Sequence, residues 1–194
     1  MSGTGSLAII ALGSNLGDAA PNVREAMDRL QESACAPLLR SSLWQSAPVD
    51  CPPGSPPFIN AVVALEPNPD ETPESLLKKL QSLERAFGRR PKKVHNEPRP
   101  VDLDLIAFGG QVRREPFLVL PHPRAHQRRF VLEPLGEIAP ALVFPGQTKT
   151  AKELLQGLPP DPSVRKLPIA PALNRNPNRN RNLRIPNRRP KAKD

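Results

Sequence analysis

The amino-acid sequence predicts an α+β domain, in which strands are joined by helical crossovers and also by a hairpin. The continuous apolar run at residues 7–12, and the run at residues 58–65 that only Asn60 interrupts, are typical of buried strands. Elsewhere, apolar residues recur three and four positions apart, as they do in amphipathic helices. A Gly109-Gly110 pair follows a strand-like segment and indicates a hairpin. The two kinds of connection in one chain favour an α+β fold over a doubly wound parallel sheet.

The first third of the chain predicts a strand, a turn and a helix. The apolar run at residues 7–12 is stopped by residues 13–18. This segment lacks the Lys-Ser/Thr pair of a phosphate-binding P-loop and the third glycine of a dinucleotide fingerprint, so it predicts only a tight turn. A helix is expected from about Pro21 to Gln31, because Val23, Met27 and Leu30 fall on one face.

Further strands are expected at residues 38–45 and 58–65, separated by a loop. Residues 47–57 contain five prolines, which exclude a central strand and predict a stiff loop suited to forming the wall of a ligand site. Three further helices are expected over residues 74–87, 128–138 (with a break at Pro134) and 150–156, and further strands over residues 101–108 and 118–120.

Net charge divides the chain in two. The whole chain of 194 residues carries +9, but residues 157–194 hold ten Lys or Arg and two Asp, which leaves +1 for residues 1–156. Beyond Leu158 the sequence is rich in Pro, Asn and Arg and poor in large apolar residues. We therefore expect one domain over residues 1–158 and a basic, disordered extension over residues 159–194.

The cysteines and the N-terminal segment indicate the cytoplasm. Cys35 and Cys51 have no metal-ligand spacing, and two such thiols suit a reducing compartment, although a single disulfide between them is an open alternative. The first residues lack a basic segment, and the apolar run that follows is too short for a signal peptide or a membrane span.

The sharpest chemical feature is the pair Asp102 and Asp104. On a strand, side chains two positions apart point to the same face, roughly 6–7 Å from each other. Two carboxylates in this arrangement suit magnesium ions, which take oxygen ligands and keep room for water and phosphate. The alternative is an edge strand with one solvated acidic face.

Cations crowd the loop before that strand and the segment after it. Arg89, Arg90, Lys92, Lys93 and Arg99 precede the two aspartates, where they would meet the charge that develops in phosphoryl transfer. An ordinary basic surface loop is the alternative. Residues 121–130 add His122 and Arg128 as candidate phosphate contacts and Phe130 as a surface for a flat ring. In mid-chain, Asn60 lies among apolar residues and suits the edge of a pterin, since an amide donates and accepts hydrogen bonds.

Five stretches, taken in order, resemble the 6-hydroxymethyl-7,8-dihydropterin pyrophosphokinase family of folate biosynthesis. They are residues 11–17, 58–62, 83–89, 98–105 and 121–130, and the resemblance covers roughly residues 6–158. It implies a ferredoxin-like, three-layer αβα domain with a mainly antiparallel sheet. It also implies ATP and a pterin bound side by side with two magnesium ions, and attack of the pterin hydroxyl on the β-phosphorus of ATP with release of AMP.

The resemblance assigns roles position by position. Asp102 and Asp104 become magnesium ligands, and Arg89 and Arg99 become the loop arginines that assist transfer. The implied ATP contacts are Gln81, Glu84, His122 and Arg128. The pterin is implied to lie between Phe58 and Phe130, with Asn60 reading its edge and Ser46 to Val49 supplying backbone contacts. Asn96, Pro91 and His95 depart from relatives that carry a tryptophan or arginines there, while Lys92 and Lys93 offer charge in the same loop.

The sequence leaves two other functions as alternatives. A nucleic-acid-binding protein would need a basic face or exposed aromatics, and a body of net +1 without tyrosine disfavours it beyond nonspecific contacts through the tail. A metal-dependent hydrolase would need a base that activates water, which nothing else in the chain suggests. We therefore expect a cytoplasmic, monomeric enzyme acting on small molecules, with no membrane partner.

Overall fold

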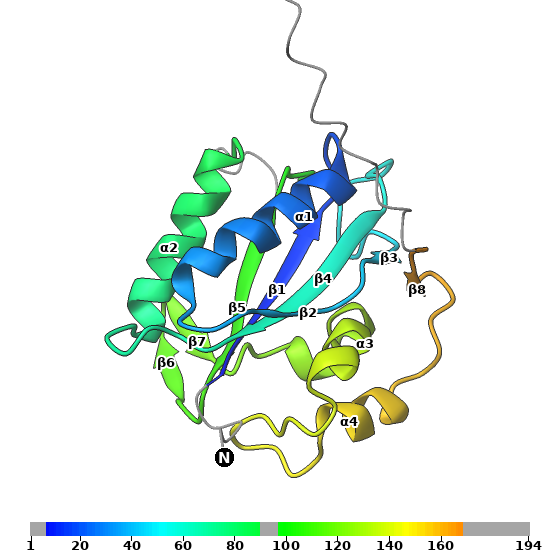
Figure 1. The fold of residues 1–194 in the computed structure, drawn as a ribbon. Helices are drawn as coiled ribbons and strands as arrows, with labels where there is room; N and C mark the ends of the chain where they lie inside the picture. The colour runs from blue at the N-terminus through cyan, green and yellow to red at the C-terminus, as the bar shows by residue number, and fades with distance from the viewer. Residues whose placement is uncertain (1–6, 90–96, 169–194) are drawn as a thin grey trace, which may run out of the picture.

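The structure is a computed structural model that describes residues 7–89 and 97–168. A six-stranded sheet runs in the order β5-β1-β4-β3-β8, and β2 pairs with β4 beside β3 (Figure 1). A separate two-stranded sheet joins β6 and β7. The elements are β1 (Ala8–Ser14), α1 (Ala19–Leu30), η2 (Gln31–Ser33), β2 (Leu39–Arg40), β3 (Trp44–Ser46), β4 (Phe58–Leu65), α2 (Pro73–Ala86), β5 (Asp102–Phe108), β6 (Arg113–Glu115), β7 (Leu118–Leu120), η3 (Ala125–Gln127), α3 (Arg129–Ile138), α4 (Ala151–Gly157) and β8 (Arg165–Lys166).

All strand pairs in the main sheet are antiparallel, and β1 lies between β4 and β5. Helix α1 follows β1 and α2 follows β4, so each connects strands that are not neighbours in the sheet. This arrangement confirms the predicted α+β class and the ferredoxin-like fold with a mainly antiparallel sheet.

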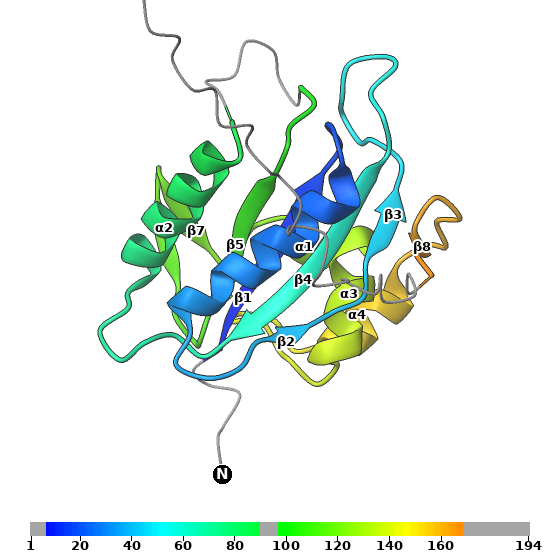
Figure 2. The same ribbon diagram turned by 45° about the horizontal axis from the view of Figure 1, so that its top comes forward.

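The sheet separates two hydrophobic clusters, which explains the three layers. On one face, residues of α1 and α2 such as Met27 and Leu80 pack on Ile10 and Leu12 of β1. On the other face, residues of α3 such as Leu132 pack on Ile9. The alternation along β1 follows from the two-residue period of a strand. Figure 2 shows α1 and α2 together on one side of the sheet, and α3 and α4 on the other.

The predicted helices form with local signals of the expected kind. Helix α2 begins at a capping box in which Thr72 and Ser75 bond each other's backbone, with Pro73 in the first turn. A second capping box, between Thr150 and Glu153, begins α4. Such caps typically contribute about 1 kcal/mol each.

Three local predictions were wrong in detail. Residues 38–45 do not form one strand, because the chain is interrupted at Ser41, whose Oγ accepts a bond from the Val62 N–H. The glycines after β5 form a turn, but β5 pairs with β1, and the partner of β6 is β7. Helix α3 runs through Pro134 without a break, although proline supplies no N–H for the preceding turn.

The predicted domain boundary at Leu158 also needs correction. Past α4, the chain turns back and forms β8, which pairs with β3, and the Leu167 N–H donates to the Leu43 carbonyl at 2.8 Å. We call residues 158–168 the C-terminal strap. The expected disordered extension therefore does not begin at residue 159, and residues 169–194 lie outside the described part of the chain. Within the described ranges, no helix has the length and apolar character needed to cross a bilayer.

Candidate active site

A cavity of about 730 Å³ opens on the α3 face of the sheet. Its floor comes from β1, β4 and β5, and its walls come from the proline-rich loop after β3, the segment from His122 to Val131, and the start of the C-terminal strap. The strand register places Asp102 and Asn60 on either side of Gly13. The cavity therefore has a carboxylate end over β5 and an amide end over β4, with a glycine between them.

Gly13 has no side chain, so nothing projects from the middle of the cavity floor at this position. A β-carbon built there would lie 3.6 Å from Phe58 Cδ1 and 3.7 Å from Asn60 Oδ1, which is ordinary contact. A side chain would thus fit without displacing the backbone, but it would take up space between the two ends of the cavity.

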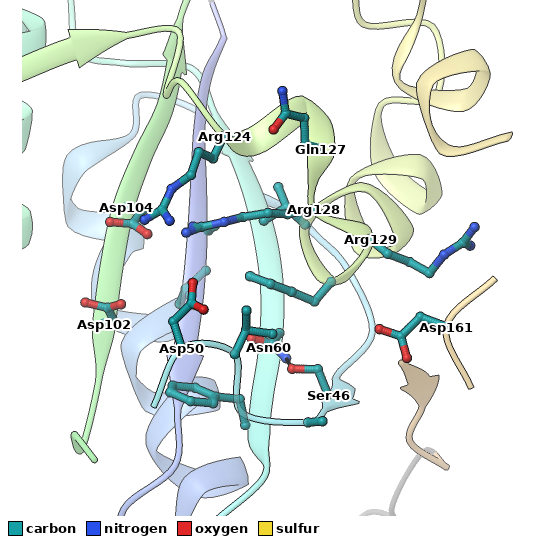
Figure 3. A pocket seen from close by; sticks show the side chains of 18 of the residues that line it. Ser46, Asp50, Asn60, Asp102, Asp104, Arg124, Gln127, Arg128, Arg129 and Asp161 are labelled. Atoms are coloured by element: carbon teal, nitrogen blue, oxygen red, sulfur yellow. Dashed lines mark hydrogen bonds between the residues drawn. The ribbon is translucent and has the colours of Figure 1, made fainter. Parts of the chain in front are cut away.

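At the carboxylate end, Asp102 and Asp104 point from β5 into the cavity, as Figure 3 shows. Between and after them, Leu103 and Leu105 point to the opposite face and pack in the core with α1 and α2. This alternation confirms that the two carboxylates share a face, which the sequence spacing predicted.

Asp102 is held between two arginines. Arg89 Nη1 donates to Asp102 Oδ1 at 2.8 Å, and Arg99 Nη1 donates to Asp102 Oδ2 at 2.9 Å. Arg89 also pairs with Glu84, whose carboxylate accepts the Leu103 N–H at 2.8 Å. Glu84 is only 6% exposed and lies behind the cavity rather than on its lining. Burial raises the pKa of Glu84, and the Leu103 hydrogen bond and Arg89 oppose that rise.

The turn after β1 fixes the position of Arg99. Asn15 is buried, and its Oδ1 accepts the Arg99 N–H at 2.9 Å. The Asn15 N–H in turn donates to the Arg99 carbonyl at 3.2 Å, and Asn15 Nδ2 donates to the Pro56 carbonyl at 3.3 Å. This one side chain therefore joins the turn, the arginine segment and the end of the proline-rich loop. The sequence predicted the turn but not this function.

At the carboxylate end, burial and the neighbouring charge of Asp102 shift the pKa of Asp104. Burial, with the charge of Asp102 adding to it, raises the pKa of Asp104 to about 6, while Arg128, Arg89 and Arg99 oppose the rise. Two carboxylates that repel each other gain from a shared cation. In the described part of the chain, no group of three or more His, Cys, Asp or Glu side chains is arranged to hold a metal. A magnesium ion here would take its remaining ligands from water and phosphate, as that ion commonly does.

Next to these carboxylates lie a neutral histidine and two arginines. Burial lowers the pKa of His122 to about 4, and Arg128 and Arg124 lower it further. The Arg124 N–H donates to His122 Nδ1 at 3.3 Å, so the neutral ring carries its proton on Nε2. Figure 3 shows the side chains of Arg124 and Arg128 extending toward Asp104. Burial, followed by the charge of Arg124, lowers the pKa of Arg128, as expected for crowded cations prepared for an anion.

The amide end is apolar apart from a few polar groups. Asn60 Nδ2 donates to Ser46 Oγ at 2.9 Å, and these side chains are 5% and 3% exposed. That bond leaves the Asn60 carbonyl oxygen for another partner. Phe130 lines the same cavity, and the Arg128 guanidinium lies over its ring, 5.5 Å from the centroid.

The cavity brings together the predicted site residues except Gln81 and Glu84. Gln81 is exposed on α2 and does not line the cavity, and Glu84 is buried behind it. The other candidate residues of the loop lie outside the described part of the chain, namely Arg90, Pro91, Lys92, Lys93, His95 and Asn96. Sequence reasoning missed Asp50, Arg124, Gln127, Arg129 and residues 158–162, which also line the cavity.

The missed residues differ in how far the sequence could have predicted them. Arg124 and Arg129 stand in the very segment that drew attention to His122 and Arg128, so the local density of arginine was a usable signal. Asp50 adopts a positive φ of 53° in the proline-rich loop. No pattern in the sequence predicted this backbone conformation. Residues 159–162 were assigned to the disordered extension by composition, and Leu158 was taken as the last residue of the domain.

Comparisons with known proteins agree with this geometry. The sequence profile of the 7,8-dihydro-6-hydroxymethylpterin-pyrophosphokinase family matches residues 9–140. This chain belongs to that family. It is 35% identical over 166 residues to the 2-amino-4-hydroxy-6-hydroxymethyldihydropteridine pyrophosphokinase of Synechocystis sp., covering 86% of this chain and 82% of the relative. It is 37% identical over 164 residues to the protein of the same name from Pseudomonas aeruginosa, covering 83% and 96%.

Among solved structures, the fold resembles wild-type HPPK-DHPS from Plasmodium falciparum with pteroate. The TM-score is 0.60 with 13% identity, and the match covers 77% of this chain and 44% of the other. This likeness concerns the fold alone, and the chain spans less than half the length of that protein.

Proposed function

We propose that this protein transfers diphosphate from ATP to the hydroxymethyl group of 6-hydroxymethyl-7,8-dihydropterin and releases AMP. The observation that carries the proposal is the layout of one cavity. Its carboxylate end carries Asp102 and Asp104 among arginines, and its amide end carries Asn60 with aromatic neighbours. The first end suits a metal-bound triphosphate, the second suits a flat heterocycle, and only Gly13 separates them in the strand register.

Asp102 and Asp104 would hold magnesium. The donor set fits, because both are carboxylates on one face of a rigid strand and the pKa of Asp104 is raised by burial and by its like-charged neighbour. Magnesium bound there would neutralise phosphate charge.

Arg89 and Arg99 would exchange a carboxylate for phosphate oxygens. In the described structure their guanidinium groups bond the two oxygens of Asp102. If Asp102 held a cation, both arginines would be free to bond the triphosphate instead. Arginine then offers paired donors to the oxygens on which charge builds during transfer. Arg124, Arg128 and His122 line the same cavity as Asp104 and would hold the remaining phosphates.

The pterin would bind at the amide end. Asn60 is pre-oriented by its bond to Ser46, so it reads the ring edge with little loss of side-chain freedom. Phe58 and Phe130 would cover the ring faces, with a gain of about 1 kcal/mol per face beyond burial. Arg128 now covers Phe130, so it would shift toward the phosphates as the ring enters.

In the proposed reaction, the hydroxyl oxygen of the pterin attacks the β-phosphorus of ATP. The bond from that phosphorus to the oxygen shared with the α-phosphate breaks, and this oxygen leaves with AMP. The hydroxyl proton passes to solvent. The chain's contribution is to align the two substrates and to supply positive charge.

The test is pterin-dependent formation of AMP in the presence of ATP and magnesium. The proposal predicts one AMP for each pterin consumed and almost none without pterin. AMP or phosphate released at the same rate without pterin would instead favour the metal-dependent hydrolase.

We also propose that the enzyme works as a monomer in the cytoplasm, without a nucleic-acid partner. The free thiols of Cys35 and Cys51 suit a reducing compartment that supplies ATP. Light scattering during size-exclusion chromatography would detect a larger assembly.

A further inference from the structure

The second half of the C-terminal strap, residues 163–167, is bonded to the edge of the sheet and to α3. Residues Arg165 and Lys166 pair with Gln45 and Trp44 of β3. Lys166 Nζ lies 2.7 Å from Glu137 Oε1 on α3, and Ser163 Oγ accepts the Ala47 N–H at 3.3 Å. The strap thus lies against β3 and Ala47, next to Ser46 at the amide end of the cavity.

Arg129, in the first turn of α3, fastens the beginning of the strap. Its Nη2 donates to the Leu158 carbonyl at 2.8 Å, and its Nε donates to the Pro159 carbonyl at 3.1 Å. The guanidinium is itself oriented by Glu133, 2.6 Å from Nη1. Three charge-assisted bonds from one planar group fix both position and direction, which a lysine would not achieve.

The fastened segment forms a wall of the cavity. Residues 158–162 line it, and Figure 3 shows Asp161 and Arg129 on the side opposite Asp102 and Asp104. Three of the five wall residues are prolines, which fix φ and present no N–H groups. Asp161 supports a turn, with its Oδ1 accepting the Ser163 N–H at 2.9 Å. Such a wall is rigid before any ligand arrives and suits the side of a ring rather than a chain of phosphates.

The wall also supports a predicted pterin contact. Phe130 is the residue that follows Arg129 in α3, and Leu158 packs against the same hydrophobic cluster as Phe130. Moving residues 158–160 would therefore change both the wall and the packing beneath Phe130. The family profile ends at residue 140, before the strap begins.

We propose that residues 158–162 are a specificity-determining wall for the pterin, and that Arg129 is the positioning residue that holds this wall in place. The inference rests on the proposed function, because it names what shapes the heterocycle end of that same site. It assigns Arg129 no contact with either substrate.

The experiment compares two dissociation constants in the full-length chain by calorimetry. One is for a non-hydrolysable ATP analogue with magnesium, and the other is for 6-hydroxymethyl-7,8-dihydropterin with that analogue saturating. The variants are Arg129→Ala, Arg129→Lys and the double substitution Pro160→Gly with Pro162→Gly. The control is Arg114→Ala, an exposed arginine on β6. We expect the three strap variants to weaken pterin binding about tenfold or more, and nucleotide binding by less than about threefold.

Other results would overturn the inference. Unchanged pterin binding in the strap variants would exclude a wall role, and an equal loss of both affinities would indicate a general structural role. If Arg129→Ala does not fold, the double proline variant provides the same test, because it keeps the bonds from Arg129 to the strap. Its pterin and nucleotide affinities are then compared by the same criteria. A wild-type protein that binds neither ligand would contradict the proposed function itself, whereas normal wild-type binding with unaffected variants would contradict only the wall.

Discussion

Arg99 Nη1 lies 2.9 Å from Asp102 Oδ2, so a proposed transfer arginine is paired with a proposed metal ligand. The backbone N–H of Arg99 is fixed separately, through Asn15 Oδ1 at 2.9 Å. The backbone is therefore anchored while the guanidinium has an exchangeable partner. This arrangement suits a residue that acts on the transition state rather than one that merely attracts ATP.

Arg99→Ala is expected to lower kcat roughly 10²–10³-fold, because positive charge aimed at the transferring group is lost. The dissociation constant for ATP should change by less than about tenfold, since other arginines remain near the phosphates. Arg89→Ala should behave alike, while Arg114→Ala on β6 serves as the control. Steady-state kinetics with direct ATP titration make the comparison. A weaker ATP affinity with unchanged kcat would show a binding role only.

Asp104→Asn should abolish turnover but stabilise the metal-free protein at neutral pH. The folded-state pKa, about 6, is above the ordinary value, so folding stability falls as pH rises from about 4 through 6. Removing that charge should add about 1–3 kcal/mol to the free energy of unfolding at pH 7.5 and almost nothing at pH 4.

Urea titrations at both pH values in EDTA measure this effect, with exposed Asp70→Asn as the control. Added magnesium should reduce the difference in the free energy of unfolding between Asp104→Asn and the wild type, because it should stabilise only the wild type. A variant less stable than wild type at pH 7.5 would show that Asp104 supports the fold instead.

Gly13→Ala should fold normally and still impair the enzyme. The added methyl group meets Phe58 and Asn60 at ordinary contact distances, so the melting temperature should change by less than about 3 °C. Because that methyl group stands between the two ends of the cavity, the KM for pterin should rise several-fold. Gly110→Ala is the matched control, since a β-carbon there meets nothing within 4 Å. Unchanged kinetics would place the substrates away from the floor of the cavity.

A chain ending at Pro168 should keep full turnover, and this prediction replaces a boundary at Leu158. The sequence predicted a disordered extension beyond Leu158, but β8 and the wall at residues 159–162 lie in the described structure. Removing residues 169–194 takes away eight of the basic residues, so salt-sensitive binding to polyanions should fall with them. Loss of turnover in a folded protein ending at Pro168 would mean that the removed segment reaches the site.

The sequence was most informative where one local pattern sufficed. The period of two around Asp102 and Asp104 correctly placed both carboxylates on one face, and the spacing of leucines predicted α2. It was least informative where distant segments meet. No local period encodes the tertiary contacts that join such segments. Examples are the hydrogen bonds from Asn15 to residues 56 and 99, the bonds from Arg129 to the strap, and the pairing of β8 with β3. Composition assigned residues 159–168 to a disordered extension. In the structure, the prolines at 159, 160 and 162 line the cavity, and Arg165 and Lys166 pair with the edge strand β3.

The most direct test of the whole account identifies the product of the wild-type reaction. The protein is mixed with ATP, magnesium and 6-hydroxymethyl-7,8-dihydropterin, and the products are identified by mass spectrometry and phosphorus NMR, with Asp102→Asn as the inactive control. We expect a pterin carrying two linked phosphates together with an equal amount of AMP. A pterin carrying a single phosphate together with ADP, or phosphate release that does not depend on pterin, would contradict it.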